Sequence, residues 1–251
     1  MIFEALRQAI AAEQPAILAT VVAGPGLGAK LYSETDGQTL GSLGDASIDA
    51  QVLADGRALL DAETSTTRTY STESGAITVL IEVYPALPHL IIVGAVHTAI
   101  PLTTCAKQLG FRVTIVDPRA AFATPERFPD ADRLIVEWPD EALPQLRLDR
   151  STYVAVLTHD PKLDDPAVRI ALAYPVRYVG AIGSTKTQAK RKATLLEAGM
   201  SEEALARIYG PIGLPLGSKT PAEIAISILG EMIAVRRGQI AQVRSRPLAS
   251  T

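Results

Sequence analysis

A turn that contains glycine and follows a short apolar run is the first feature of this sequence suited to chemistry. The run His89–Val93 is apolar and β-branched, which is typical of a buried strand, and it leads directly into Gly94. In parallel α/β sheets, such a turn with a helix N-terminus behind it binds the diphosphate of a dinucleotide. We therefore interpret Gly94, Ala95, Val96 and His97 as candidate cofactor-binding residues.

Two charged residues follow at the spacing that this chemistry requires. Asp117 lies 23 residues after Gly94, where a carboxylate would accept hydrogen bonds from a ribose diol. Arg119 could meet a phosphate instead. The alternative for Asp117 is a carboxylate that caps a loop at the end of a strand. Val96 weakens the NAD(P) hypothesis, because its β-branch crowds the backbone position where a second glycine would approach the diphosphate.

A second candidate anion site comes later in the chain. Gly183 and Ser184 precede a basic helix that begins with Lys186, so backbone N–H groups would face a bound phosphate. The alternative is a solvated basic helix face. His159 and Asp160 end another expected strand on the same edge of the sheet, where a histidine could donate, accept or transfer a proton. A loop histidine bonded to backbone is the competing interpretation.

The elements that position these residues alternate between strand and helix, which predicts an α/β domain with a parallel, Rossmann-like sheet. Apolar runs predict strands at 89–93, 112–116, 133–136, 152–157 and 176–180. Periodic apolar residues predict helices near 98–109, 139–146, 163–173, 185–198, 201–208 and 221–236. The last helix has a good N-terminal signal in Thr220, Pro221 and Glu223.

The domain boundary falls at Pro85-Ala86-Leu87-Pro88, which breaks regular structure between two expected strands. Residues 1–86 predict a smaller mixed α/β domain, with a helix after Gly44 that is interrupted near Gly56. We expect residues 87–238 to form the Rossmann-like domain and residues 239–251 to be a frayed polar tail.

Charge divides the chain in the same place. Residues 1–86 carry four basic and eleven acidic side chains, a net charge of −7, whereas 87–251 carry twenty and sixteen, a net charge of +4. This favours an anionic ligand for the second domain, with chance as the alternative.

Composition excludes several classes of protein. With 251 residues, 47% of them hydrophobic and 20% charged, the chain is globular rather than disordered. The net charge of −3 argues against nucleic acid as a partner, and the single cysteine, Cys105, excludes a disulfide framework and a zinc site of cysteine pairs. We find neither a signal peptide nor an apolar run near the roughly 20 residues of a membrane span. The sequence thus predicts a cytoplasmic protein with no membrane partner.

Together, the motifs resemble the XdhC/CoxI family of accessory proteins for molybdenum hydroxylases. They occur in the family's order over about 150 residues: Leu90-Ile91-Ile92-Val93-Gly94-Ala95, Val116-Asp117-Pro118-Arg119, Leu157-Thr158-His159-Asp160, Tyr178-Val179-Gly180-Ala181-Ile182-Gly183-Ser184, Pro211-Ile212-Gly213-Leu214 and Thr220-Pro221-Ala222-Glu223-Ile224-Ala225. The first half matches more loosely, through Gly28-Ala29-Lys30 and Gly41-Ser42-Leu43.

The resemblance implies a cytoplasmic homodimer that binds molybdenum cofactor, helps it receive its terminal sulfur and delivers it to a molybdenum hydroxylase subunit, without turnover of its own. The chain departs from the family in its first half. The family's Ser-Pro-Arg before Gly28-Ala29-Lys30 is missing, and Asp49 stands where the family has a glutamate. Ser47 stands where the family has a cysteine, and a hydroxyl is neither a soft ligand nor a sulfur nucleophile at neutral pH. Cys105 is no substitute, because we expect it in the core. Two alternatives stay open: an NAD(P)-dependent oxidoreductase and a degenerate scaffold that binds only a partner protein.

Overall fold

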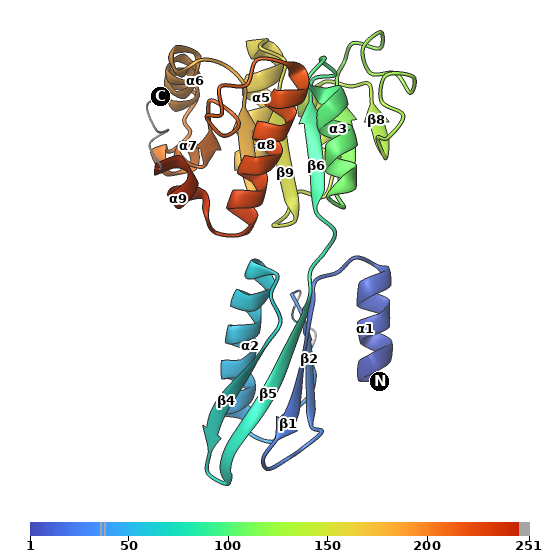
Figure 1. The fold of residues 1–251 in the computed structure, drawn as a ribbon, viewed down its shortest axis with the longest axis vertical. Helices are drawn as coiled ribbons and strands as arrows, with labels where there is room; N and C mark the ends of the chain where they lie inside the picture. The colour runs from blue at the N-terminus through green and yellow to red at the C-terminus, as the bar shows by residue number, and fades with distance from the viewer. Residues whose placement is uncertain (36, 38, 246–251) are drawn as a thin grey trace. The chain divides into compact units, whose positions relative to one another are not determined.

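The computed structural model describes residues 1–35, 37 and 39–245, and the chain forms two compact units, Met1–Ala86 and Leu87–Thr251 (Figure 1). Each unit has its own sheet and its own apolar cores.

The first unit is an antiparallel five-stranded sheet with a helix on each face. The strand order is β3-β2-β1-β5-β4, and the helices α1 and α2 lie on opposite sides of the sheet (Figure 1). The elements are α1 (Ile2–Ala11), β1 (Ala16–Ala23), β2 (Lys30–Glu34), β3 (Thr39–Gly41), α2 (Ala46–Ala62), β4 (Thr66–Thr72) and β5 (Gly75–Tyr84).

Alternation along β1 explains this arrangement. Ile17 and Ala19 point into the core beneath α2, whereas Ala16 and Leu18 pack with α1. The expected interruption of α2 at Gly56 is wrong, because the helix is continuous. A Cβ at this glycine would lie 2.9 Å from Ile17 Cγ2, so the missing side chain lets α2 approach β1 closely.

The second unit is a parallel six-stranded sheet in the order β11-β10-β9-β6-β7-β8. Counted from β6, this is the 3-2-1-4-5-6 order of doubly wound dinucleotide-binding folds, so the predicted Rossmann-like class is confirmed. Its strands are β6 (His89–Val93), β7 (Arg112–Val116), β8 (Arg133–Ile135), β9 (Thr152–Val156), β10 (Tyr178–Ala181) and β11 (Ile208–Tyr209). The five expected strands are present, and β11 was not predicted.

Helices cover both faces of this sheet, so its strands are buried on both sides. Leu90 and Ile92 of β6 pack in the core that contains α3 and α8, while Ile91 and Val93 face the core of α4 and α5. The helices are α3 (Ala99–Gln108), α4 (Pro139–Ala142) with a 3-10 turn at Leu143–Gln145, α5 (Pro161–Leu172), α6 (Thr185–Glu197), α7 (Glu202–Ala206), α8 (Pro221–Arg236) and α9 (Ile240–Ser245).

The C-terminal part of the unit differs from expectation. The capping box of Thr220 and Glu223 begins α8 as predicted. The frayed tail expected from residue 239 is instead the short helix α9 over residues 240–245, which contacts α8. Residues 246–251 of that expected tail lie outside the described part of the chain.

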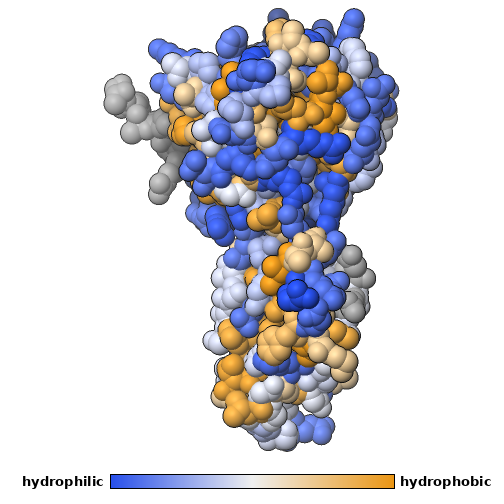
Figure 2. All heavy atoms as spheres, turned by 90° about the vertical axis from the view of Figure 1, so that its right-hand side faces the viewer, coloured by the Kyte–Doolittle hydropathy of each residue, from blue (hydrophilic) through white to orange (hydrophobic). Residues whose placement is uncertain are grey.

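The surface of each unit carries both apolar and hydrophilic residues (Figure 2). Figure 2 shows apolar residues interspersed with hydrophilic ones on the drawn face of each unit, and exposed side chains include Phe122, Trp138 and Leu216. Within residues 1–35, 37 and 39–245, no helix has the length and apolar character needed to cross a membrane.

Candidate functional site

The turn after β6 is tight, and it packs against the turn after β9. Gly94 has φ +109°, a backbone conformation that suits glycine, and a Cβ there would lie 2.5 Å from Thr158 Cγ2. Ala95 is buried next to it. Val96 packs partly buried against the core of α3, and His97 is exposed. The turn therefore lies at the switch point where the chain order reverses between β6 and β9.

Asp117 follows β7 and is completely buried, with both carboxylate oxygens bonded to the protein. Oδ2 accepts the backbone N–H of Ala95 at 2.7 Å and Arg119 Nη2 at 2.7 Å. Oδ1 accepts the backbone N–H and the Nε of Arg119 at 2.9 and 2.8 Å. A carboxylate offers about four acceptor positions, so these four bonds fill it. A ribose diol would have to displace one of them.

Electrostatics keep Asp117 ionised in this buried position. Burial by itself would raise the pKa of the Asp117 carboxyl, but the hydrogen bonds from Arg119 and Ala95 outweigh it and hold that pKa below its ordinary value. The hydrogen bonds to Asp117 raise the pKa of the Arg119 guanidinium. The Arg119 side chain is 40% exposed, and its Cζ lies 4.5 Å from the ring centre of Phe122. Arg119 is thus held by Asp117 while part of its side chain stays exposed to solvent.

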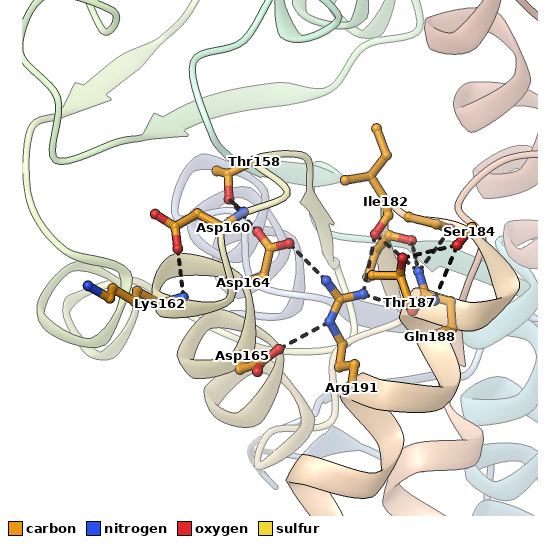
Figure 3. Close-up of polar contacts among 12 residues, drawn as sticks. Thr158, Asp160, Lys162, Asp164, Asp165, Ile182, Ser184, Thr187, Gln188 and Arg191 are labelled. Atoms are coloured by element: carbon orange, nitrogen blue, oxygen red, sulfur yellow. Dashed lines mark hydrogen bonds and ion pairs between the residues drawn. The ribbon is translucent and has the colours of Figure 1, made fainter.

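Thr158, His159 and Asp160 form the turn between β9 and α5. Thr158 Oγ1 donates to Asp164 Oδ1 at 2.5 Å and accepts from the backbone N–H of Asp160 (Figure 3). The Asp160 side chain caps α5 by accepting the N–H of Lys162 at 3.0 Å. His159 is exposed and has φ +66°, so it stands out from the turn between two fixed neighbours.

A buried arginine joins this turn to the next one. Arg191 of α6 donates through Nη2 to Asp164 Oδ2 at 2.8 Å and through Nε to Asp165 Oδ1 at 3.2 Å (Figure 3). Its Nη1 donates to Gln188 Oε1, and Gln188 Nε2 donates to the carbonyl of Ala181 at 2.9 Å. Burial raises the pKa of Asp164 although Thr158 and Arg191 oppose the shift.

The sequence does not predict this network, because it indicates only that the helix carrying Arg191 is basic and faces either an anion or solvent. The structure leaves Arg191 6% exposed. The available signal was spacing, since Ser184, Gln188 and Arg191 recur on one side of a helix.

Gly183 and Ser184 open α6 as expected. Gly183 has φ +124°, and a Cβ there would lie 2.8 Å from Thr187 Cγ2. Ser184 caps the helix by accepting the N–H of Thr187 at 3.2 Å. Lys186 lies in the first turn and is exposed.

A cavity of about 650 Å³ opens beside these two turns. Its walls come from the turns after β9, β10 and β11 and from α8 and α9: His159, Ile182, Gly183, Ser184, Pro211, Ile212, Gly213, Leu214, Pro215, Leu216, Gly217, Ser218, Ile224, Ser227 and Arg244. Among these lining residues, Arg244 is the charged side chain and none is a carboxylate. Of the twelve predicted site residues, His159, Gly183 and Ser184 lie in the cavity wall, and the other nine do not.

Glu231 is buried beside the cavity and holds Arg244. Its Oε2 accepts Tyr178 Oη at 2.5 Å and the backbone N–H of Gly213 at 3.0 Å. Its Oε1 accepts Arg244 Nε at 3.0 Å and also Nη2. Sequence reasoning missed both residues. The available signal was an acidic residue within an otherwise apolar helix.

Ser47 belongs to the first unit, and Cys105 to the second. Ser47 is exposed in the first turn of α2, where its N–H donates to the capping Asp45 at 2.7 Å. Cys105 is half-buried and packs against the core of α3 and α8 rather than within it, so it is less buried than expected. In the part of the chain that the structure describes, no group of three or more His, Cys, Asp and Glu residues is arranged to hold a metal ion.

Known proteins resemble the chain in both units. Residues 90–232 match the family model described as the XdhC Rossmann domain, and residues 9–71 match that of the XdhC and CoxI family. A protein of Bacillus subtilis named as a probable subunit of xanthine dehydrogenase is 32% identical over 150 residues, which are 60% of this chain and 43% of that protein. The molybdenum cofactor insertion chaperone PaoD of Escherichia coli is 32% identical over 93 residues, 37% of this chain and 29% of PaoD.

The chain spans less than half the length of the curated relatives it matches. The crystal structure of a xanthine dehydrogenase from Bacillus halodurans has the same fold, with a TM-score of 0.54 and 22% identity over 100% of this chain and 98% of that one. Since the Rossmann-domain match alone covers more than half of the sequence, the chain belongs to the XdhC/CoxI family.

Proposed function

We propose that the chain is an accessory protein in the maturation of molybdenum hydroxylases, and that it holds molybdenum cofactor for delivery without turning over a substrate. The observation that carries this proposal is the cavity beside β10, whose lining, among the residues that the structure describes, is mainly apolar and includes one cation and no carboxylate. A relative named as a molybdenum cofactor insertion chaperone supports it.

The residues of the cavity fit the chemistry of the cofactor. Molybdopterin has a flat pterin body and a phosphate, so it needs apolar walls and anion donors together. Ile182, Ile212 and Leu214 supply apolar surface, while Ser184 and Arg244 supply donors. When bound, the cofactor would supply the redox-active molybdenum that the client enzyme uses. His159 lies at the cavity wall as a further donor or acceptor.

Ser47 limits what this chain does with sulfur. The serine hydroxyl is exposed, but it forms no persulfide and is a poor ligand for soft metals. We therefore assign the chain to holding and delivering the cofactor, and sulfur transfer to another protein.

Equilibrium titration with molybdopterin released from a purified molybdenum hydroxylase tests the proposal. We expect binding in the micromolar range or tighter, and capture of a molybdenum hydroxylase subunit by the loaded protein. Absence of binding at micromolar protein would reject the proposal. Light scattering on the same samples would test the homodimer expected from the resemblance.

The strand order favours a second candidate, an NAD(P)-dependent oxidoreductase, since it is the order of dinucleotide-binding folds. The filled carboxylate of Asp117 opposes it. Titration with the four nicotinamide dinucleotides, on the natural chain and on Val96→Gly, separates the two. A chain that binds neither class of ligand and still captures a hydroxylase subunit would be a scaffold.

A further inference from the structure

The cation of the cavity comes from a segment beyond the part of the chain that matches the family. The match to the Rossmann-domain model ends at residue 232, within α8. Arg244 lies in α9, twelve residues later, and its side chain reaches the cavity wall. The charged side chain of this cavity therefore lies outside the residues that match the family model.

The Arg244 guanidinium is fixed before any ligand arrives. It donates through Nε and Nη2 to Glu231, a carboxylate with no exposed surface that Tyr178 Oη and the N–H of Gly213 hold from the other side. The Arg244 Cζ lies 5.4 Å from the ring centre of Tyr209. A guanidinium has five N–H donors, so the two that Glu231 accepts leave three. The side chain is 37% exposed.

The balance of charge in the cavity selects the kind of ligand. Glu231 is buried behind Arg244 and is absent from the cavity wall, so a ligand meets the guanidinium and not the carboxylate. An ion pair of this kind orients an arginine for bidentate recognition of phosphate. The apolar residues Ile182, Ile212 and Ile224 provide a surface for a planar body.

We propose that Arg244 binds the phosphate of a phosphorylated planar heterocycle in this cavity, and that Glu231 is the positioning residue that aims it. The inference rests on the proposed function for the location of the ligand, and it adds the contact and the ligand class. A phosphorylated pterin and a nucleoside monophosphate share this chemistry.

The test uses the full chain and a matched pair of probes. The stable, oxidised, fluorescent derivative of molybdopterin is titrated with its phosphate present and after phosphatase treatment, and AMP is titrated separately. The variants are Arg244→Gln, Arg244→Lys, Glu231→Gln, the double variant of Arg244→Gln with Glu231→Gln, and the control Arg237→Gln, which removes an exposed arginine at the end of α8. Far-UV circular dichroism checks that each is folded.

We expect the natural chain to bind the phosphorylated pterin at least tenfold more tightly than the dephosphorylated one. Arg244→Gln and the double variant abolish this preference, and Arg244→Lys restores part of it. Glu231→Gln keeps only part of the preference, because its amide oxygen still accepts from Arg244 but its amide nitrogen cannot accept the N–H of Gly213. Arg237→Gln leaves the preference unchanged. The double variant matters because it removes the buried charge together with its partner.

Three outcomes separate this inference from the proposed function. Pterin binding that Arg244→Gln leaves unchanged would overturn the inference and support the function. AMP binding that needs Arg244, with no pterin binding, would support the inference and overturn the function. If Arg244→Gln weakened the phosphorylated and the dephosphorylated pterin to the same extent, α9 would act only by packing, and the inference would also be overturned.

Discussion

Asp117 and Arg119 form a two-pronged ion pair within one turn, with Nε to Oδ1 at 2.8 Å and Nη2 to Oδ2 at 2.7 Å. The same carboxylate accepts the N–H of Ala95. In dinucleotide-binding proteins a carboxylate at this position binds a ribose. In this chain the Asp117 carboxylate instead links the turn after β6 to the turn after β7.

The first prediction concerns the stability of the second unit. Asp117→Ala leaves the donors of Ala95 and Arg119 without their acceptor, and we expect a loss of about 3 kcal/mol in the free energy of unfolding. Asp117→Asn keeps the shape and one acceptor oxygen, so we expect a loss of about 1–2 kcal/mol. Urea denaturation followed by circular dichroism measures both. Glu197→Gln, at an exposed residue of α6, is the control and should change little. Equal stability of Asp117→Ala and the control would contradict a tying role.

The second prediction concerns Arg191, which links α6 to α5. Arg191→Ala leaves the buried Asp164 without its ion-pair partner and should cost about 3 kcal/mol or more. It also releases Gln188, which holds the carbonyls of the turn before α6. Hydrogen exchange of residues 181–188 should therefore rise more than exchange elsewhere in the second unit.

Lys190→Ala is the matched control for Arg191→Ala, because Lys190 is exposed on the same helix. We expect its exchange pattern to equal that of the natural chain. A uniform rise of exchange throughout the unit in Arg191→Ala would show global destabilisation rather than local release of the turn.

The third prediction is a pH dependence that comes from His89, a buried residue whose Nε2 lies 2.8 Å from Thr114 Oγ1. Burial lowers the pKa of His89, although the charges of Asp149 and Asp132 oppose the shift and Arg133 adds to it. The unfolded chain then binds a proton near its ordinary pKa of 6.5, which the folded chain binds only at lower pH. Stability contributed by the neutral form is present above about pH 6.5 and is lost as the pH falls through the folded pKa.

His89→Gln removes this titration and keeps a polar group for Thr114. Urea unfolding at a series of pH values below 6.5 should show a steeper fall for the natural chain than for the variant. Parallel curves for the two proteins would mean that His89 makes no contribution.

Sequence reasoning predicts the second fold well because five of its strands are continuous apolar runs bounded by turns. It misses β11, since two residues, Ile208 and Tyr209, carry no periodicity. The interruption expected at Gly56 is wrong for a tertiary reason, namely the approach of Ile17, which local propensity cannot express.

The site was only partly readable for a related reason. The sequence shows that Arg191, Glu231 and Arg244 are charged, but their burial and pairing depend on helices that are distant in the chain. Gly94 and Ser184 were recognised because a tight turn and a helix N-cap depend on the neighbouring residues in the sequence.

The fourth prediction addresses Ser47 in the first turn of α2, at the position where the resemblance to the family implies a cysteine. Ser47→Cys places a thiol on an exposed residue near a helix N-terminus, which lowers a thiol pKa, while Asp45 in the capping position opposes that effect. Since the site is exposed, we expect a stability change within about 0.5 kcal/mol.

With Cys105→Ser as background, the new thiol should react with iodoacetamide faster than Cys105 does in the natural chain, because Cys105 is half-buried against a core. Mass spectrometry of the alkylated peptides measures both rates. If the engineered thiol reacted no faster than Cys105, this helix end would not be an accessible position for sulfur chemistry, and exchanging the serine alone would not restore the ligand type that the family carries there.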